Sequence, residues 1–297
     1  GDVGKGPSES TGHYQGITPP SNGYTIYANN SGSFTAIYCA NNDTQLINFT
    51  NGFSNQTFTS ATECLNWYMT QSGYACVNRD YESIVTNGLT VNIDAGFTGS
   101  YSTSGTTIYD ISYNANNGLL SNGPTYDSNN GGSILFNAAA DQSININSAA
   151  NILSTTAYTK IAWFNCNNFV SYNNNIISGG NTGQHAFWLY NSNKLNAGHN
   201  SVWNLVVSTT TLSLNTWYCG AVTFDTTNGW KLYLNGVQES TNSNTVSFVG
   251  TGDIQIARYQ GGNNFSGKIA IAQVYNRVLS ASEILQNFNA QKSRFGL

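Results

Sequence analysis

The chain closes with GKIAIAQVYNRVLSASEILQNFNAQKSRFGL (residues 267–297), a stretch in which a strand pattern turns into a helix pattern. The apolar run from Ile269 to Tyr275 predicts a strand, which Asn276 ends. A helix is predicted to start after Ser280, because its hydroxyl can accept a hydrogen bond from the amide of Glu283 while the Glu283 carboxylate returns one to the amide of Ser280. The stretch therefore predicts a β-rich protein that ends in a short, capped helix.

The predicted helix has one apolar side. Ile284, Leu285 and Phe288 form an apolar stripe, and Lys292 and Arg294 stand near the C-terminal end, where positive charge favours the helix dipole. We expect this helix to cover one end of the β-structure that precedes it.

Hairpin signals recur throughout residues 87–297. Six of the eight Asn-Gly pairs of the chain lie there, and Asn-Gly favours tight hairpin turns because both residues tolerate positive φ. Alternating runs between these turns predict strands at 89–94, 133–137, 143–147, 160–166, 185–190, 202–207, 217–225, 230–236, 253–257 and 268–275. So many short strands at this spacing predict a sandwich or a barrel.

The run NGWKLYLNG (228–236) shows the alternation that an antiparallel sheet requires. Trp230, Leu232 and Leu234 share one face, and Lys231 and Tyr233 share the other. We expect the first face to be buried and the second to be solvated.

Two smaller segments precede this domain. Residues 1–22 are rich in Gly, Ser and Pro and predict an extended arm. Residues 23–86 predict a small α+β domain, with strands at 24–28, 34–40 and 75–81, a further short strand within 43–53, and a helix capped by Ser60 and Glu63.

The composition excludes several classes of protein. Charged residues are only 8% of the chain, the net charge is -4, and the ten cationic residues are scattered, so we expect no nucleic-acid partner. The sequence has no run of 18 apolar residues and no apolar segment at its start, so we expect neither a membrane span nor a signal peptide.

The five cysteines leave two alternatives open. They show no metal-ligand spacing and their number is odd, which favours buried free thiols. The other alternative is a disulfide that joins Cys64 to Cys39 or to Cys76.

Residues 87–297 resemble the laminin-G-like, concanavalin A-like lectin/glucanase domains. The resemblance rests on LTVNIDAGF with the Asn-rich loop after it, on AYTKIAWFNC, on NTWYCGAVTFDTTNGWKLYLNGV, on DIQIARY and, most specifically, on FSGKIAIAQVYNRVLSASEILQNFNAQKSRFG. It implies a mainly β protein whose large domain is an antiparallel jelly-roll β-sandwich of the concanavalin A-like type with a short C-terminal helix.

Residues 80–110 and the ending NAQKSRFGL (289–297) also resemble domains in structural proteins of tailed bacteriophages. This second resemblance implies a non-enzymatic virion protein, such as a head decoration, fibre or tail-associated protein. It would assemble in the host cytoplasm with other virion proteins and with further copies of itself, and would stand on the virion surface, where it could adhere to host-surface glycans. The alternative is a carbohydrate-binding module or adhesin whose main role is glycan recognition.

Catalysis is not expected. Glycoside hydrolases need two carboxylates that face one bond, and the Glu-x-Asp-x-x-Glu strand of the glucanases is absent from this sequence. The five Glu and the three His are dispersed along the chain, so neither an acid pair nor a Ser/His triad is indicated.

A structural Ca²⁺ is one possible cofactor. Ca²⁺ prefers carboxylate and amide oxygens, which Asp94, Asp110, Asn114, Asn116 and Asn117 offer around the loop YDISYNANNG. The family often places calcium near this edge, although Ser112 and the two residues after it depart from the usual Ser-Gly-Asn. The alternative is that these side chains only form Asx turns.

A glycan site is predicted on the hairpins around residue 190. Trp188 and Tyr190 share a strand face with Ala186, and His199, Asn200 and Trp203 follow in the next hairpin. Aromatic faces stack on sugar rings and amides bind hydroxyls. The alternative is that the aromatic residues belong to the core.

Overall fold

The computed structural model describes residues 23–31, 33–78, 84–112, 114–146, 152–169, 174–179, 184–190, 193–250, 253–260 and 262–297. The chain divides into two compact units, residues 1–82 and residues 83–297. The arm expected at residues 1–22 lies outside the described residues. No helix within the described ranges is long and apolar enough to cross a membrane.

The first unit consists of a three-stranded antiparallel sheet and two helices, as expected for a small α+β domain. Its sheet has the order β2-β1-β3. The elements are β1 (Tyr24–Asn30), β2 (Ser33–Ala40), α1 (Asp43–Ser54), α2 (Ala61–Met69) and β3 (Tyr74–Asn78). Helix α2 begins with the predicted capping box of Ser60 and Glu63.

The short strand expected within residues 43–53 is wrong, because this segment forms helix α1. The side chain of Asn42 caps the helix by accepting a hydrogen bond from the amide of Gln45 at 3.0 Å. Leu46 and Thr50, one helical turn apart, are its buried residues. The apolar pattern suited either structure, and the cap together with burial on one side selects the helix.

The second unit contains three antiparallel sheets. The large sheet has the order β18-β17-β16-β10-β20-β8-β7, with β4 also paired to β20; the two smaller sheets have the orders β11-β13-β14-β15 and β12-β19-β9-β6-β5. Strands of the large sheet are β4 (Leu89–Asp94), β7 (Thr125–Asp127), β8 (Ser133–Phe136), β10 (Ala157–Cys166), β16 (Trp217–Asp225), β17 (Gly229–Leu234), β18 (Val237–Asn242) and β20 (Gly267–Tyr275). Strands of the smaller sheets are β5 (Thr107–Ile108), β6 (Gly118–Ser121), β9 (Ser143–Ile146), β11 (Asn174–Asn175), β12 (Ile177–Ser178), β13 (His185–Leu189), β14 (Leu195–His199), β15 (Val202–Val207) and β19 (Ile254–Ile256). The helical elements are η2 (Asn129–Gly131), η3 (Ala138–Ala140), α3 (Ala281–Gln291) and η4 (Lys292–Phe295).

The main core lies between the large sheet and the two smaller ones. It joins Phe164 and Val222 of the large sheet to Phe187 and Ile256 of the smaller sheets in one buried cluster. This packing confirms the expected antiparallel β-sandwich, and every one of the ten runs that predicted strands contributes one.

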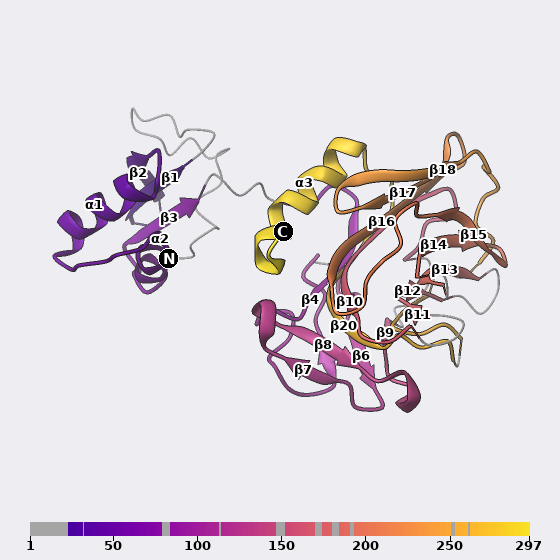
Figure 1. Cartoon of the computed structure of the whole chain (residues 1–297). Coiled ribbons are helices and arrows are strands. Elements are labelled where there is room, and N and C mark those ends of the chain that lie inside the picture. The colour runs from indigo at the N-terminus through magenta and orange to yellow at the C-terminus, as the bar shows by residue number, and fades with distance from the viewer. Residues whose placement is uncertain are drawn as a thin grey trace. The chain divides into compact units, whose positions relative to one another are not determined.

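The closing helix covers the outer face of the large sheet, and the expectation that it covers one end of the sandwich is wrong. Figure 1 shows α3 on the side of β10, β16 and β20 that faces away from β11–β15. Trp163, Tyr233, Ile284 and Phe295 form a second buried cluster there. Tyr233, expected on a solvated face, is only 1% exposed, because this segment removes the middle of that face from water.

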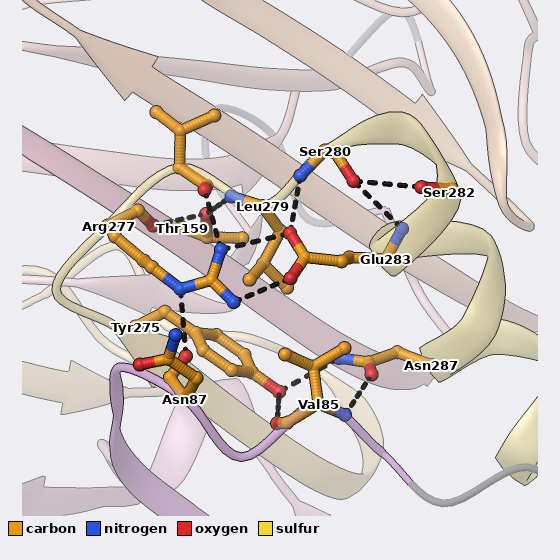
Figure 2. Close-up of polar contacts among 11 residues, drawn as sticks. Val85, Asn87, Thr159, Tyr275, Arg277, Leu279, Ser280, Ser282, Glu283 and Asn287 are labelled. Carbon is orange, nitrogen blue, oxygen red and sulfur yellow. Dashed lines mark hydrogen bonds and ion pairs between the residues drawn. The ribbon is translucent and has the colours of Figure 1, made fainter.

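A polar network fastens the helix to the last strand and to residues 84–88 (Figure 2). The guanidinium of Arg277 donates to the Glu283 carboxylate at 2.9 and 2.6 Å and to the carbonyl of Asn87 at 2.9 Å. Asn287 accepts from the amide of Val85 at 2.8 Å and donates to the hydroxyl of Tyr275 at 2.8 Å. The start of the second unit is therefore bound directly to its closing helix, and the division between the units falls a few residues before the boundary that we expected at residue 86.

Replacing Glu283 by Ala should cost about 2 kcal/mol, because it removes both the predicted cap and the ion pair with Arg277. The Arg277 hydrogen bonds lower the pKa of Glu283 to about 2. A carboxyl whose folded pKa is lowered adds stability above its ordinary pKa, and this stability is lost as the pH falls toward about 2. Urea unfolding at pH 7 measures the cost. Glu283→Gln is the matched control, since it keeps an acceptor for Ser280 and should cost less; equal stability of all three proteins would contradict the role.

The cysteines are free thiols. Cys64, Cys76, Cys166 and Cys219 are buried, and Cys39 is half-buried. Burial raises the pKa of the Cys76 thiol to about 12 and that of the Cys166 thiol to about 11, so these side chains act as small apolar residues.

Candidate functional site

The candidate site lies on the outer face of the sheet β11-β13-β14-β15. Alternation along β13 sends Phe187 and Leu189 into the main core. Ala186 and Trp188 therefore point the other way, and both line an open pocket. The strand thus places an indole at the surface of a sheet whose inner face is fully packed.

The pocket has an aromatic wall and an amide wall. Its volume is about 340 Å³, counted with the open space at its mouth. The residues that line it are Asn175, Ala186, Trp188, Trp203, Tyr259 and Asn263. None of these side chains carries a charge, so the pocket suits a neutral, partly apolar ligand.

A side chain of the aromatic wall is bonded to the backbone of another residue of the same wall. The indole N–H of Trp188 donates to the carbonyl of Trp203 at 2.9 Å, and the rings of Trp203 and Tyr259 meet at 5.2 Å with an interplanar angle of 68°. Within the part of the chain that the structure describes, neither the Trp203 indole N–H nor the Tyr259 hydroxyl has a hydrogen-bond partner. Both groups are available to a ligand.

The Tyr259 hydroxyl is protonated at neutral pH, as an ordinary tyrosine is, and partial burial raises its pKa further. Desolvation raises the pKa of Tyr259 to about 12, so at neutral pH the phenol can both donate and accept a hydrogen bond. A sugar hydroxyl, which can itself donate or accept, can therefore pair with this phenol in either direction.

The amide wall is rigid. The Asn175 side chain donates to the carbonyl of Asn263 at 2.9 Å and accepts from the Ser178 hydroxyl at 2.7 Å. Asn175 is buried; its bond to Asn263 joins the four-stranded sheet to the loop that carries Asn263, and its bond to Ser178 joins it to β12 of the neighbouring sheet. The pocket is therefore formed before any ligand arrives.

The structure brings together two of the five residues that the sequence predicted for a glycan site. Trp188 and Trp203 line the pocket. Tyr190 stands beside it, 41% exposed, with its ring against Trp188 at 5.2 Å. His199 is buried in the main core, and Asn200 holds a loop by bonds to Ser247 and Val249.

Three lining residues were missed by the sequence reasoning. Asn175, Tyr259 and Asn263 come from segments that are distant in the chain from the predicted hairpins. A signal for two of them is the Gly-rich stretch YQGGNNFSG (259–267), which includes Tyr259 and Asn263 and has the composition of a loop. Such loops carry function in folds of this type.

A family model described as the concanavalin A-like lectin/glucanases superfamily matches residues 137–285, which is half of the chain. The chain belongs to the concanavalin A-like lectin/glucanase superfamily. The match includes β13, β14, β15 and β19, and hence the whole of the pocket. No curated protein matches the chain.

Solved structures share the sandwich at low sequence identity. Domain 4 of an arabinanase from Geobacillus stearothermophilus, solved in complex with arabinotriose, has a TM-score of 0.54 and 15% identity over 68% of this chain and 98% of its own. A Trypanosoma rangeli sialidase mutant has a TM-score of 0.55 and 16% identity over 71% of this chain but only 34% of its own. The binding domain of Paraclostridial Mosquitocidal Protein 1 has a TM-score of 0.51 and 15% identity over 69% of this chain and 52% of its own. At these identities the likeness shows the fold alone, and this chain spans about a third of the sialidase.

Glucanases use carboxyl groups as acid catalysts, and the residues that line this pocket do not supply one. Among the described residues, none of those that line it carries a carboxylate. Two of the glutamates have other partners: Glu239 accepts hydrogen bonds from Thr209 and Thr210, and Glu283 accepts from Arg277.

The residues expected to bind Ca²⁺ have other partners. Arg294 binds both carboxylate oxygens of Asp94 at 2.7 and 2.9 Å. Asp110 accepts from the amides of Asn92, Ser112 and Asn116 and from the Ser112 hydroxyl. The amides of Asn114 and Asn116 donate to backbone carbonyls, and the Asn117 side chain accepts from the amide of Asp110.

This donor arrangement has the form of an Asx-type loop. Its carboxylate lone pairs already face N–H and O–H donors, which leaves few for a cation. Across the described residues there is no group of three or more His, Cys, Asp or Glu side chains that could hold a metal. The calcium site stays a prediction that these contacts do not support.

Proposed function

We propose that the sandwich is a non-enzymatic carbohydrate-binding unit and that the pocket of Trp188, Trp203 and Tyr259 receives one neutral sugar residue. The main support comes from two hydrogen-bond donors on the wall of this uncharged aromatic pocket, the Trp203 indole N–H and the Tyr259 hydroxyl. Among the described residues, neither donor has a hydrogen-bond partner. Sugar C–H faces pack on aromatic rings, and sugar hydroxyls pair with amides and phenols.

A solved domain with a similar fold and a known ligand suggests a neutral oligosaccharide as the first probe. The arabinanase domain is solved with arabinotriose, an uncharged sugar. The absence of any cation from the residues that line this pocket argues against an anionic sugar. A glycan array that includes arabinotriose tests the proposal, and failure of every neutral glycan at millimolar sensitivity would refute it.

Trp203→Ala should weaken binding of the best array glycan at least about tenfold, or 1.4 kcal/mol, because it removes both a stacking face and a donor. Titration calorimetry with that glycan measures the loss. Tyr109→Ala is the matched control, since Tyr109 is also an exposed aromatic residue, at 53%, and does not line the pocket. A similar affinity for both variants would contradict the assignment.

We further propose that this unit is displayed on a bacteriophage particle as a head decoration, fibre or tail-associated protein, where it adheres to host-surface glycans. Support comes from the resemblance of residues 80–110 and 289–297 to phage structural proteins. In this setting residues 1–82 contact other virion proteins or further copies of the chain.

Mass spectrometry of purified particles tests the location. Deletion of residues 1–22 tests assembly, and unchanged assembly would contradict the role of the arm. The alternative is a bacterial adhesin, and detection of the protein on the surface of cells that carry no phage would favour it.

A further inference from the structure

Four polar side chains cross the middle of the sandwich core. Tyr158 and Lys160 lie on β10 of the large sheet, and His185 and His199 lie on β13 and β14 of the sheet that carries the pocket. Each of the four is at most 1% exposed. Polar groups at this depth are retained only where their hydrogen bonds are complete.

The first contact joins Lys160 to His185. The Lys160 Nζ lies 2.7 Å from His185 Nδ1 and 3.2 Å from the carbonyl of Ile177. His185 Nε2 lies 2.8 Å from the carbonyl of Asp253, which can only accept, so Nε2 carries the proton and Nδ1 is the acceptor. Lys160 therefore faces two acceptors, which matches the two N–H groups of a neutral amine.

The second contact joins Tyr158 to His199. His199 Nε2 lies 2.8 Å from the carbonyl of Val246, so this nitrogen also donates. His199 Nδ1 then accepts from the Tyr158 hydroxyl at 3.1 Å. Both histidines are held as neutral rings with the proton on Nε2.

Within the part of the chain that the structure describes, no carboxylate is among the groups that shift the pKa of either histidine. The rings of Phe224, Trp230 and Phe248 surround His199, and Phe248 also meets His185. Burial lowers the pKa of His199 to about 4. Burial lowers the pKa of His185 and that of Lys160 well below their ordinary values. The groups that affect the histidines are Lys160, the other histidine and the two carbonyls, with no carboxylate among them.

These contacts anchor the layer that carries the pocket. His185 is followed on β13 by Ala186 and Trp188, and β15, which pairs with the strand of His199, carries Trp203. The carbonyls of Val246 and Asp253 stand on the segment that leads to Tyr259. Trp188 is therefore on the strand of His185, Trp203 is on the strand paired to that of His199, and Tyr259 follows the segment whose carbonyls accept from both histidines.

We propose that the Lys160–His185 and Tyr158–His199 contacts form an acid-sensitive fastener, which releases the sheet β11-β13-β14-β15 from the large sheet in mildly acidic solution and so dismantles the pocket. Solvated histidine binds a proton below about pH 6.5, whereas the packed ring does not. Since the detached sheet binds more protons, detachment becomes more favourable as the pH falls below that value. Lys160 acts in the same direction because its packed form is also neutral. The consequence for ligand release rests on the proposed function.

Hydrogen exchange of the full chain at pH 7.5 and pH 5.0, followed by mass spectrometry, tests the fastener without any sugar. Rates are compared as protection factors, which correct for the intrinsic slowing of exchange in acid. For each histidine that detachment returns to its ordinary pKa, we expect protection of β13 and β14 to fall at least about 30-fold between the two pH values. Protection of β10, β16 and β20 should change less.

His185→Gln with His199→Gln is the decisive variant, because glutamine offers one donor and one acceptor but does not titrate. Its loss of protection in β13 and β14 should be at least about 30-fold smaller than that of the natural chain. If the double variant does not fold at pH 7.5, each single substitution should remove part of the effect. Equal losses in the natural chain and the variants, or the same loss in all three sheets, would overturn the proposal. A detaching sheet in a protein that binds no glycan would refute only the proposed function.

Discussion

Trp163→Ala is expected to cost about 4 kcal/mol of the free energy of unfolding and to release the closing helix from the large sheet. Trp163 is fully buried on β10. Its indole is nearly parallel to Phe295 at 4.2 Å and to Phe288 at 5.7 Å, and its N–H donates to Gln291 at 2.9 Å. One side chain thus contacts three residues of the closing segment, and alanine would remove its contact with each of them, although Phe295 would keep Trp217.

Urea unfolding of the full chain measures this cost, and proteolysis near residue 291 reports the release. Trp163→Phe is the matched control: it keeps the aromatic packing, loses the bond to Gln291 and should cost clearly less. A loss for Trp163→Ala below about 1 kcal/mol would mean that the helix is held elsewhere, since truncation of a buried Trp normally costs about 3–5 kcal/mol.

Arg294→Ala is expected to cost about 3 kcal/mol, because one guanidinium donates to four acceptor atoms, three of them in part-buried bonds. Besides both oxygens of Asp94, it donates to the carbonyls of Asn130 at 2.7 Å and Gly132 at 2.6 Å. The side chains of Arg294 and Asp94 are only 21% and 19% exposed. Its removal would leave the Asp94 carboxylate with the Gly96 amide but without its ionic partner, and would take a donor from each of the two carbonyls.

Arg294→Lys separates charge from geometry. Lysine keeps a positive charge near Asp94 but cannot place donors on all of these acceptors at once. We expect it to recover roughly half of the loss in the same unfolding experiment. Full recovery would show that only the charge matters, and no recovery would show that the planar fork is essential.

Local chemistry was readable from the sequence. The bond between Ser280 and Glu283 joins residues three apart and formed as predicted, at 3.2 Å. Trp188 and Trp203 were predicted together because they lie on neighbouring hairpins, and they do line one pocket. Both results depend on spacing along the chain, which sequence reasoning measures directly.

The alternation of side chains along a strand predicted less well which of the two faces is buried. Tyr233 was assigned to a solvated face, yet that face is covered by a helix that starts at residue 281. Helix α1 shows a similar limit, since its apolar residues fit a strand or a helix until Asn42 and the burial of Leu46 select one.

The sequence by itself determined the strands, the capped final helix and the membership of the sandwich class, because hydrophobic alternation, Asn-Gly turns and capping boxes act between residues close in the chain. Only the tertiary structure decided that Asp94 serves Arg294, that His199 lies in the core, and that Asn175, Tyr259 and Asn263 complete the pocket. These outcomes depend on which strands become neighbours and which face a covering segment removes from water. Such contacts join residues as far apart as 200 positions, and only the packing of whole sheets brings them together.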